Sequence, residues 1–146
     1  GGTAYNVIPE SVTLRGTIRT FDEKVKADIH RRLHEIVAGK GTLEIAKMTR
    51  VLVNDPRMCR IVREAAASVV GRDNVVTDER TAGGEDFASV LAAVPGCFFF
   101  VGSASKDSGG FPHHHPRFDV DERSLAIGLE ILTRSARRYL ERGFEG

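Results

Sequence analysis

The chain has 146 residues, of which 41% are hydrophobic and 28% charged, a composition typical of a folded globular protein rather than a disordered segment. Its 21 basic and 20 acidic residues give a formal net charge of +1, which argues against electrostatic attraction to nucleic acid or an anionic membrane. No apolar run approaches the roughly 18 residues of a membrane span, and we find no secretory signal pattern. The expected ligand is therefore a small molecule or another protein.

The chain contains two cysteines, Cys59 and Cys97. They fall in segments that we expect to be a buried helix and a buried strand, which favours reduced core thiols over a disulfide framework. Reduced thiols are typical of the cytoplasm, so we expect a cytoplasmic protein.

The first third of the sequence is typical of a strand, a helix and a second strand. Apolar and polar residues alternate over residues 12–19, which predicts a strand with one buried face and with Arg19 on the open face. Asp22 is placed to cap a helix that Gly39 and Gly41 terminate. A strand is expected over residues 42–48, so the helix would cover one face of a small sheet.

A domain boundary is expected next, after residue 52, because Asp55 and Pro56 form a strong helix start. The predicted helix ends at Gly71. Its apolar stripe consists of Met58, Ile61, Val62, Ala65, Ala66, Val69 and Val70.

The remaining chain predicts two strands and two helices. A short strand is expected over residues 75–77 and a short helix over residues 85–93, and the apolar run 97–101 predicts a strand buried on both faces. Asp119 and Asp121 are placed to cap a long final helix. The apolar stripe predicted for that helix consists of Leu125, Leu129, Leu132, Ala136 and Leu140.

Three histidines stand between Pro112 and Pro116 in the loop before this final helix. Neutral imidazole is a common ligand of catalytic transition metals, so a metal site is the first hypothesis, beside a polar surface loop that is merely rich in histidine. In an extended segment His114 would face away from His113 and His115, so the three could not easily bind one ion.

Other groups offer weaker candidates. His30 and His34 have metal-compatible spacing on the first helix, but they lie among charged residues on a helix flank. Glu85 and Asp86 fit the start of a helix better than a site, because carboxylates are stabilised there. We find no motif of nucleophilic catalysis or of nucleic-acid binding.

Five ordered segments, GGTAYNVIP, GTIRTFD, VNDP, GEDF and HHPRFD, together resemble the C-terminal part of the M20 metallopeptidase family. The resemblance is to the branch of aminoacylases, hippurate hydrolases and indole-acetyl-amino-acid hydrolases. It implies an α/β fold: part of an α+β lid and dimerisation domain at residues 1–52, then the C-terminal part of an α/β catalytic domain at residues 53–146. It also implies homodimers formed through the lid.

The resemblance further implies roles for three residues. His114 matches the family's last metal ligand in the motif His-x-Pro, and two ions of zinc or manganese are expected in the complete enzyme. Asn6 and Arg19 match lid residues that contact the substrate, and an arginine on the open face of a strand suits a carboxylate. The remaining metal ligands, the general-base glutamate and the lid histidine match nothing in this chain, so we predict no catalytic residue here.

The function implied is metal-dependent hydrolysis of the amide bond in N-acyl amino acids or dipeptide-like substrates. We expect the chain to be a C-terminal portion of such an enzyme and to be inactive alone, because metal-assisted hydrolysis needs both a metal-bound water and a base. The alternative is a non-catalytic dimerisation or interaction module derived from such an enzyme, since unpaired sheet edges invite another chain.

Overall fold

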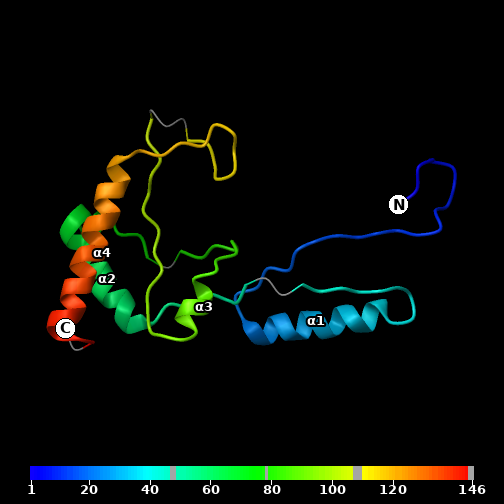
Figure 1. Cartoon of the computed structure of the whole chain (residues 1–146), viewed down its shortest axis with the longest axis horizontal. Helices are drawn as coiled ribbons and strands as arrows, with labels where there is room; N and C mark the ends of the chain where they lie inside the picture. The colour runs from blue at the N-terminus through cyan, green and yellow to red at the C-terminus, as the bar shows by residue number, and fades with distance from the viewer. Residues whose placement is uncertain (47–48, 78, 107–109, 145–146) are drawn as a thin grey trace. The chain divides into compact units, whose positions relative to one another are not determined.

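The computed structural model describes residues 1–46, 49–77, 79–106 and 110–144 (Figure 1). These residues form two compact units, Gly1–Lys47 and Met48–Gly146. The division into these units falls after residue 47, and the domain boundary expected after residue 52 stays a prediction. Among the helices described, none is long and apolar enough to cross a membrane.

The first unit contains one helix, α1, which spans Glu23–Val37. The Asp22 carboxylate accepts hydrogen bonds from the N–H groups of Lys24 and Val25 at 2.6 and 3.1 Å, so the predicted cap is confirmed. The helix ends beside Gly39, whose φ of 70° is a conformation that glycine adopts without steric cost. No residue of α1 is buried, so this unit has little core of its own.

The second unit begins with α2, Pro56–Val70, and the short 3-10 helix η1, Arg72–Asn74. The predicted start is confirmed, because the Asp55 carboxylate accepts from the N–H groups of Arg57 and Met58 and Pro56 occupies the first turn. Gly71, with a φ of 84°, ends the helix as predicted.

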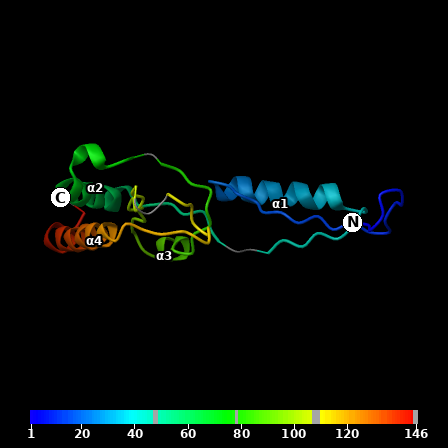
Figure 2. The same cartoon turned by 90° about the horizontal axis from the view of Figure 1, so that it is seen from above.

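Helix α2 packs against α4, Arg123–Arg142, and the two lie side by side in both views (Figures 1 and 2). Ala65 is fully buried and Ile131 is 4% exposed. Small residues on α4, Ser124 and Ser135, are also buried. The α2 stripe predicted from the sequence is confirmed, because all seven of its residues are buried or half-buried.

The stripe predicted for α4 is wrong, because Leu125, Leu129, Leu132, Ala136 and Leu140 are all exposed. The face that packs runs instead through Ser124, Gly128, Ile131 and Ser135. Small side chains let two helices approach closely, so this face fits α2 although it carries fewer apolar atoms. Helix α4 thus has a second apolar face that no described residue buries.

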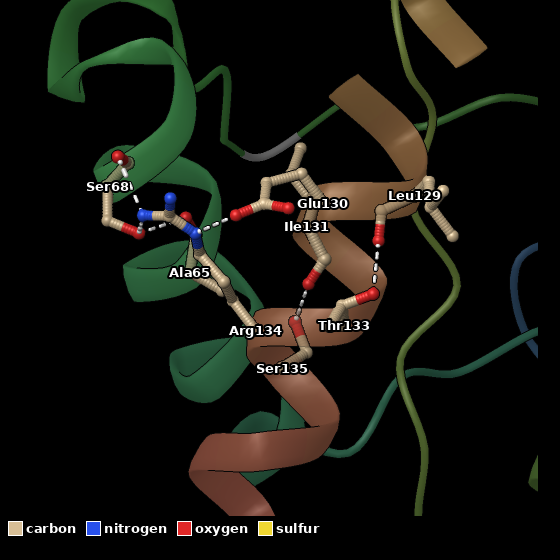
Figure 3. A network of polar contacts seen from close by, with 8 residues as sticks. All are labelled: Ala65, Ser68, Leu129, Glu130, Ile131, Thr133, Arg134 and Ser135. Carbon is tan, nitrogen blue, oxygen red and sulfur yellow. Dashed lines mark hydrogen bonds and ion pairs between the residues drawn. The ribbon is translucent and has the colours of Figure 1, made fainter. Parts of the chain in front are cut away.

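Two arginines of α4 reach α2. Arg134 donates from Nη1 to the carbonyl and hydroxyl oxygens of Ser68 at 3.1 and 3.0 Å, and from Nε to Glu130 at 2.7 Å (Figure 3). Arg138 pairs with Glu64 at 3.1 Å. The hydroxyls of Thr133 and Ser135 bond to carbonyl oxygens one turn earlier in their own helix (Figure 3).

The four predicted strands, at residues 12–19, 42–48, 75–77 and 97–101, are not formed among the described residues, which exclude 47 and 48. A strand requires backbone pairing with a neighbour. Around residues 97–101, Asn54 bridges the backbone of Phe98 by accepting from its N–H and donating to its carbonyl, both at 2.8 Å. Phe100 is 67% exposed, so the segment is not buried on both faces as predicted.

The short third helix, α3, spans Ala88–Leu91, within the predicted residues 85–93. The Glu85 carboxylate accepts from the N–H of Phe87 at 3.1 Å, which supports its predicted place at a helix start. Asp119 does not cap α4 as predicted, because its side chain accepts from the N–H of Val120. The N-cap position of α4 is Glu122 rather than the predicted Asp121, and Glu122 makes no side-chain cap bond. Asp121 lies one residue earlier and accepts from the N–H of Arg123, the first residue of α4.

Replacing the buried Ile131 with alanine should lower the free energy of unfolding by about 2–4 kcal/mol, because it leaves a cavity between α2 and α4. The neighbouring variant Leu132→Ala is the control and should cost less than about 1 kcal/mol, because Leu132 is 57% exposed. Urea unfolding followed by circular dichroism measures both. Equal losses would contradict the packing described here.

Acid should loosen the starts of α2 and α4. The Arg57 guanidinium lowers the pKa of Asp55 from 3.8 to about 2, and Arg123 does the same for Asp121. Because both pKa values are depressed, the stabilisation is complete above about pH 4 and is lost as the pH falls towards 2. Far-ultraviolet circular dichroism should show helix loss in this window.

The control for this titration is the double variant Asp55→Asn and Asp121→Asn, which keeps a capping oxygen but removes the ionisable groups. Its helix signal should change less between pH 4 and pH 2 than that of the unmodified chain. If the double variant and the unmodified chain lose helix signal over the same pH range, the acid transition must come from groups other than Asp55 and Asp121.

Candidate functional site

The loop between segment 97–101 and α4 carries His113, His114 and His115, and we call it the histidine loop. A backbone hydrogen bond joins its two ends. The N–H of Asp121, just before α4, donates to the carbonyl of Ser103 at 2.8 Å. The chain leaves the extended segment 97–101, forms the loop and returns to the start of α4 (Figure 1). This hydrogen bond therefore holds the beginning of the loop, at Ser103, next to the start of α4.

Two consecutive turns shape the histidine motif. The N–H of His115 donates to the carbonyl of Pro112 at 3.1 Å, and the N–H of Phe118 donates to the carbonyl of His115 at 2.9 Å. Pro116 occupies the second position of the second turn, where its fixed φ is favourable. The expected extended conformation is therefore wrong, because the motif turns at each proline.

His114 has a φ of 68°, and it is the one residue other than glycine with a positive φ among the described part of the chain. It is the third residue of the first turn, a position at which some turn types require positive φ. This conformation is costly for a residue with a side chain, and such strain is found most often at functional sites.

The neighbouring histidines contact aromatic rings. His115 stacks on Phe111, with ring centroids 4.4 Å apart and 8° between the planes. The guanidinium of Arg117 lies over the same Phe111 ring, 4.2 Å from its centroid. His113 packs edge to face against Phe118 at 4.9 Å. These contacts use two of the three imidazoles for packing, and no spacing in the sequence indicates them.

His114 is exposed, and the described residues give it no hydrogen bond, ion pair or ring contact. Its ring is thus open to a ligand. However, no group of three or more histidine, cysteine, aspartate or glutamate side chains within the described ranges could hold a metal ion. A catalytic zinc site uses about three protein ligands. The described residues therefore supply one candidate donor and do not by themselves fit a metal ion.

The predicted substrate residues, Asn6 and Arg19, are both exposed and belong to the first unit, whereas His114 belongs to the second. Because no strand forms at residues 12–19, the open face predicted for Arg19 stays a prediction. The buried face predicted opposite it is wrong, because Val12 is 60% and Leu14 91% exposed. His30 and His34 lie on α1, and no third donor in the described chain joins them.

A family model for peptidase family M20/M25/M40 matches residues 6–138, which is most of the chain. The chain belongs to this family. No solved structure matches it significantly. Membership supports an α/β peptidase fold, while the division into a lid and a catalytic part stays a prediction.

Curated relatives agree with this family. The chain is 32% identical to an N-acetyl-L-cysteine deacetylase of Bacillus subtilis (strain 168), covering 97% of this chain and 34% of the relative. It is 30% identical to IAA-amino acid hydrolase ILR1-like 4 of Arabidopsis thaliana, covering 96% and 34%. It is 35% identical to thermostable carboxypeptidase 2 of Saccharolobus solfataricus, covering 87% and 34%. The chain thus spans about a third of the length of these relatives.

The tautomer of His115 offers a test of the loop geometry. Its Nδ1 accepts a hydrogen bond from the N–H of Arg117 at 3.1 Å, so the neutral ring must carry its proton on Nε2. Long-range proton–nitrogen NMR spectra at mildly alkaline pH should show this tautomer for His115. An Nδ1 proton on His115 would contradict the second turn, and His113 in the same spectrum provides the comparison.

Proposed function

We propose that this chain is part of a metal-dependent hydrolase that cleaves the amide bond of N-acyl amino acids or dipeptide-like substrates. His114 would bind one of two divalent ions, zinc or manganese, and Asn6 and Arg19 would contact the substrate. The observation that carries the proposal is the exposed imidazole of His114 at a strained turn, in a chain that belongs to a peptidase family. Of the three loop histidines, His114 is the one without an aromatic contact among the described residues.

The relatives support the class of substrate. Their names describe removal of an acetyl group from N-acetyl-cysteine, hydrolysis of an amino-acid conjugate and removal of a terminal amino acid. The bond broken in all three reactions joins an acyl group to the nitrogen of an amino acid. A guanidinium such as that of Arg19 can hold the carboxylate of such a substrate through two parallel hydrogen bonds.

The division of roles within the histidine loop supports His114 as the ligand. His115 stacks on Phe111 and its Nδ1 accepts a hydrogen bond from Arg117, and His113 packs on Phe118. His114 has neither kind of contact with the described residues. A metal bound to His114 would polarise the substrate carbonyl and activate water. Because the described residues provide one donor and no identified base, we propose that the 146-residue chain alone does not turn over substrate.

We also propose that the protein forms a homodimer through the first unit and that it works in the cytoplasm. Apolar side chains of this unit are strongly exposed, among them Ile8 at 95% and Leu14 at 91%. Extended apolar segments of this kind favour pairing with another chain. Light scattering coupled to size exclusion separates a dimer from a monomer.

A chimera tests the catalytic proposal. The matching third of the Bacillus subtilis N-acetyl-L-cysteine deacetylase is replaced with this chain, and release of acetate from N-acetyl-L-cysteine is measured with zinc or manganese. The chimera should hydrolyse the substrate, whereas the chain alone should not exceed the buffer background. His114→Ala in the chimera should lower the rate by about 100-fold or more, since even outer-sphere partners of a ligand contribute 10–100-fold.

The matched control is His113→Ala in the same chimera, because it removes a neighbouring imidazole that packs on Phe118. It should keep most of the activity and the bound metal. A His114→Ala chimera with unchanged activity and metal content would refute the assignment of the ligand. Turnover by the chain alone would refute the proposed dependence on other donors.

A further inference from the structure

Two thiols that are far apart in the sequence meet in the second unit. Cys59 lies in the first turns of α2 and Cys97 begins the extended segment 97–101, and their Sγ atoms are 3.6 Å apart. Both side chains are half-buried and neither forms a disulfide. The separation is close to contact distance, so a modest movement brings the sulfurs within bonding range.

Hydrogen bonds on either side of the sulfurs hold this arrangement. The N–H of Asp55 donates to the carbonyl of Gly96 at 2.9 Å, immediately before Cys97. Asn54 bonds to both the N–H and the carbonyl of Phe98, immediately after it. Because Cys59 is one helical turn beyond Asp55, the same bonds fix both cysteines relative to each other.

We propose that Cys59 and Cys97 form a reversible intramolecular disulfide that locks the start of α2 to the extended segment 97–101. The co-reactant is a low-molecular-weight disulfide such as oxidised glutathione. This inference concerns the stability and redox state of the second unit and is independent of the proposed hydrolysis.

The exchange has two steps. The Cys59 thiolate attacks one sulfur of the small disulfide, which breaks the sulfur–sulfur bond, forms a mixed disulfide and releases one thiolate. Cys97 then loses its proton to solvent and attacks Sγ of Cys59, which forms the internal disulfide and releases the second thiolate. In total, two protein thiols are oxidised and one small disulfide is reduced to two thiols.

Cys97 is suited to the second step rather than the first. Burial, together with the neighbouring Cys59, raises the pKa of the Cys97 thiol to about 12. A thiol that holds its proton is a poor attacker of a disulfide in solution. It can still react with a sulfur held beside it, because the effective concentration of a fixed neighbour is high.

A redox titration of the chain tests the proposal. The chain is equilibrated with mixtures of reduced and oxidised glutathione, quenched with acid and analysed by mass spectrometry, in buffer and in urea. In buffer, the main oxidised product should be a monomer lighter by two hydrogen atoms. The effective concentration of the two thiols should be at least about tenfold higher in buffer than in urea. The oxidised chain should also melt on the order of 10 °C higher.

Two variants separate a fixed pair from incidental proximity. In Cys59→Ser with Arg60→Cys, the thiol moves to the next, exposed position of α2 with almost the same loop length. This variant should form mostly mixed disulfides with glutathione. Asn54→Ala, which removes the bonds to Phe98, should lower the effective concentration towards the value in urea.

Three results would overturn the proposal. One is an effective concentration in buffer no higher than in urea. Another is a main oxidised product at equilibrium that carries glutathione on Cys59 or joins two chains. The third is equal formation of the internal disulfide by the Arg60→Cys control.

Discussion

The contact between α2 and α4 is the interaction on which the second unit depends. The two helices pack against each other, and the buried apolar side chains of the second unit include Ala65 of α2 and Ile131 of α4. Burial of apolar area contributes about 25 cal/mol per Å², so a core of so few side chains has little stability to spare. Arg134 and Arg138 extend the contact with polar bonds, but their exposure makes each a small contribution.

Both helices also organise the chain between them. The segment 97–101 is bonded at one end to Asp55, at the start of α2, and just beyond its other end to Asp121, at the start of α4. The histidine loop follows this segment in the chain. The strained backbone of His114 therefore lies in a loop whose preceding segment is hydrogen-bonded to the starts of both helices. Strain of this kind persists only where surrounding structure fixes it, and the two turns and the aromatic contacts of His113 and His115 provide that.

Local signals in the sequence were sufficient for the helices. Asp22, Asp55 and Gly71 stand where predicted, because a cap acts on residues within one turn of itself. The strands were predicted wrongly because their formation is not local. Alternation of apolar and polar residues indicates which face of a strand would be buried, but a strand forms only when it pairs with a segment that can be distant in the sequence. The choice between the two faces of α4 is also non-local, since the leucine-rich face has the stronger pattern but Ser124, Gly128 and Ser135 fit α2 more closely.

The candidate site shows the same limit. Spacing and proline placement identified the histidine loop, and the ordered motifs identified the family, which the match to residues 6–138 confirms. No pattern in the sequence revealed that the ring of His115 would stack on Phe111 or that the ring of His113 would pack against Phe118. These contacts leave His114 as the one of the three histidines without an aromatic contact in the described part of the chain, which aromatic packing and turn geometry determine rather than the spacing of the histidines. In the proposed metal site, the other donors would meet an exposed ring whose backbone the two turns hold.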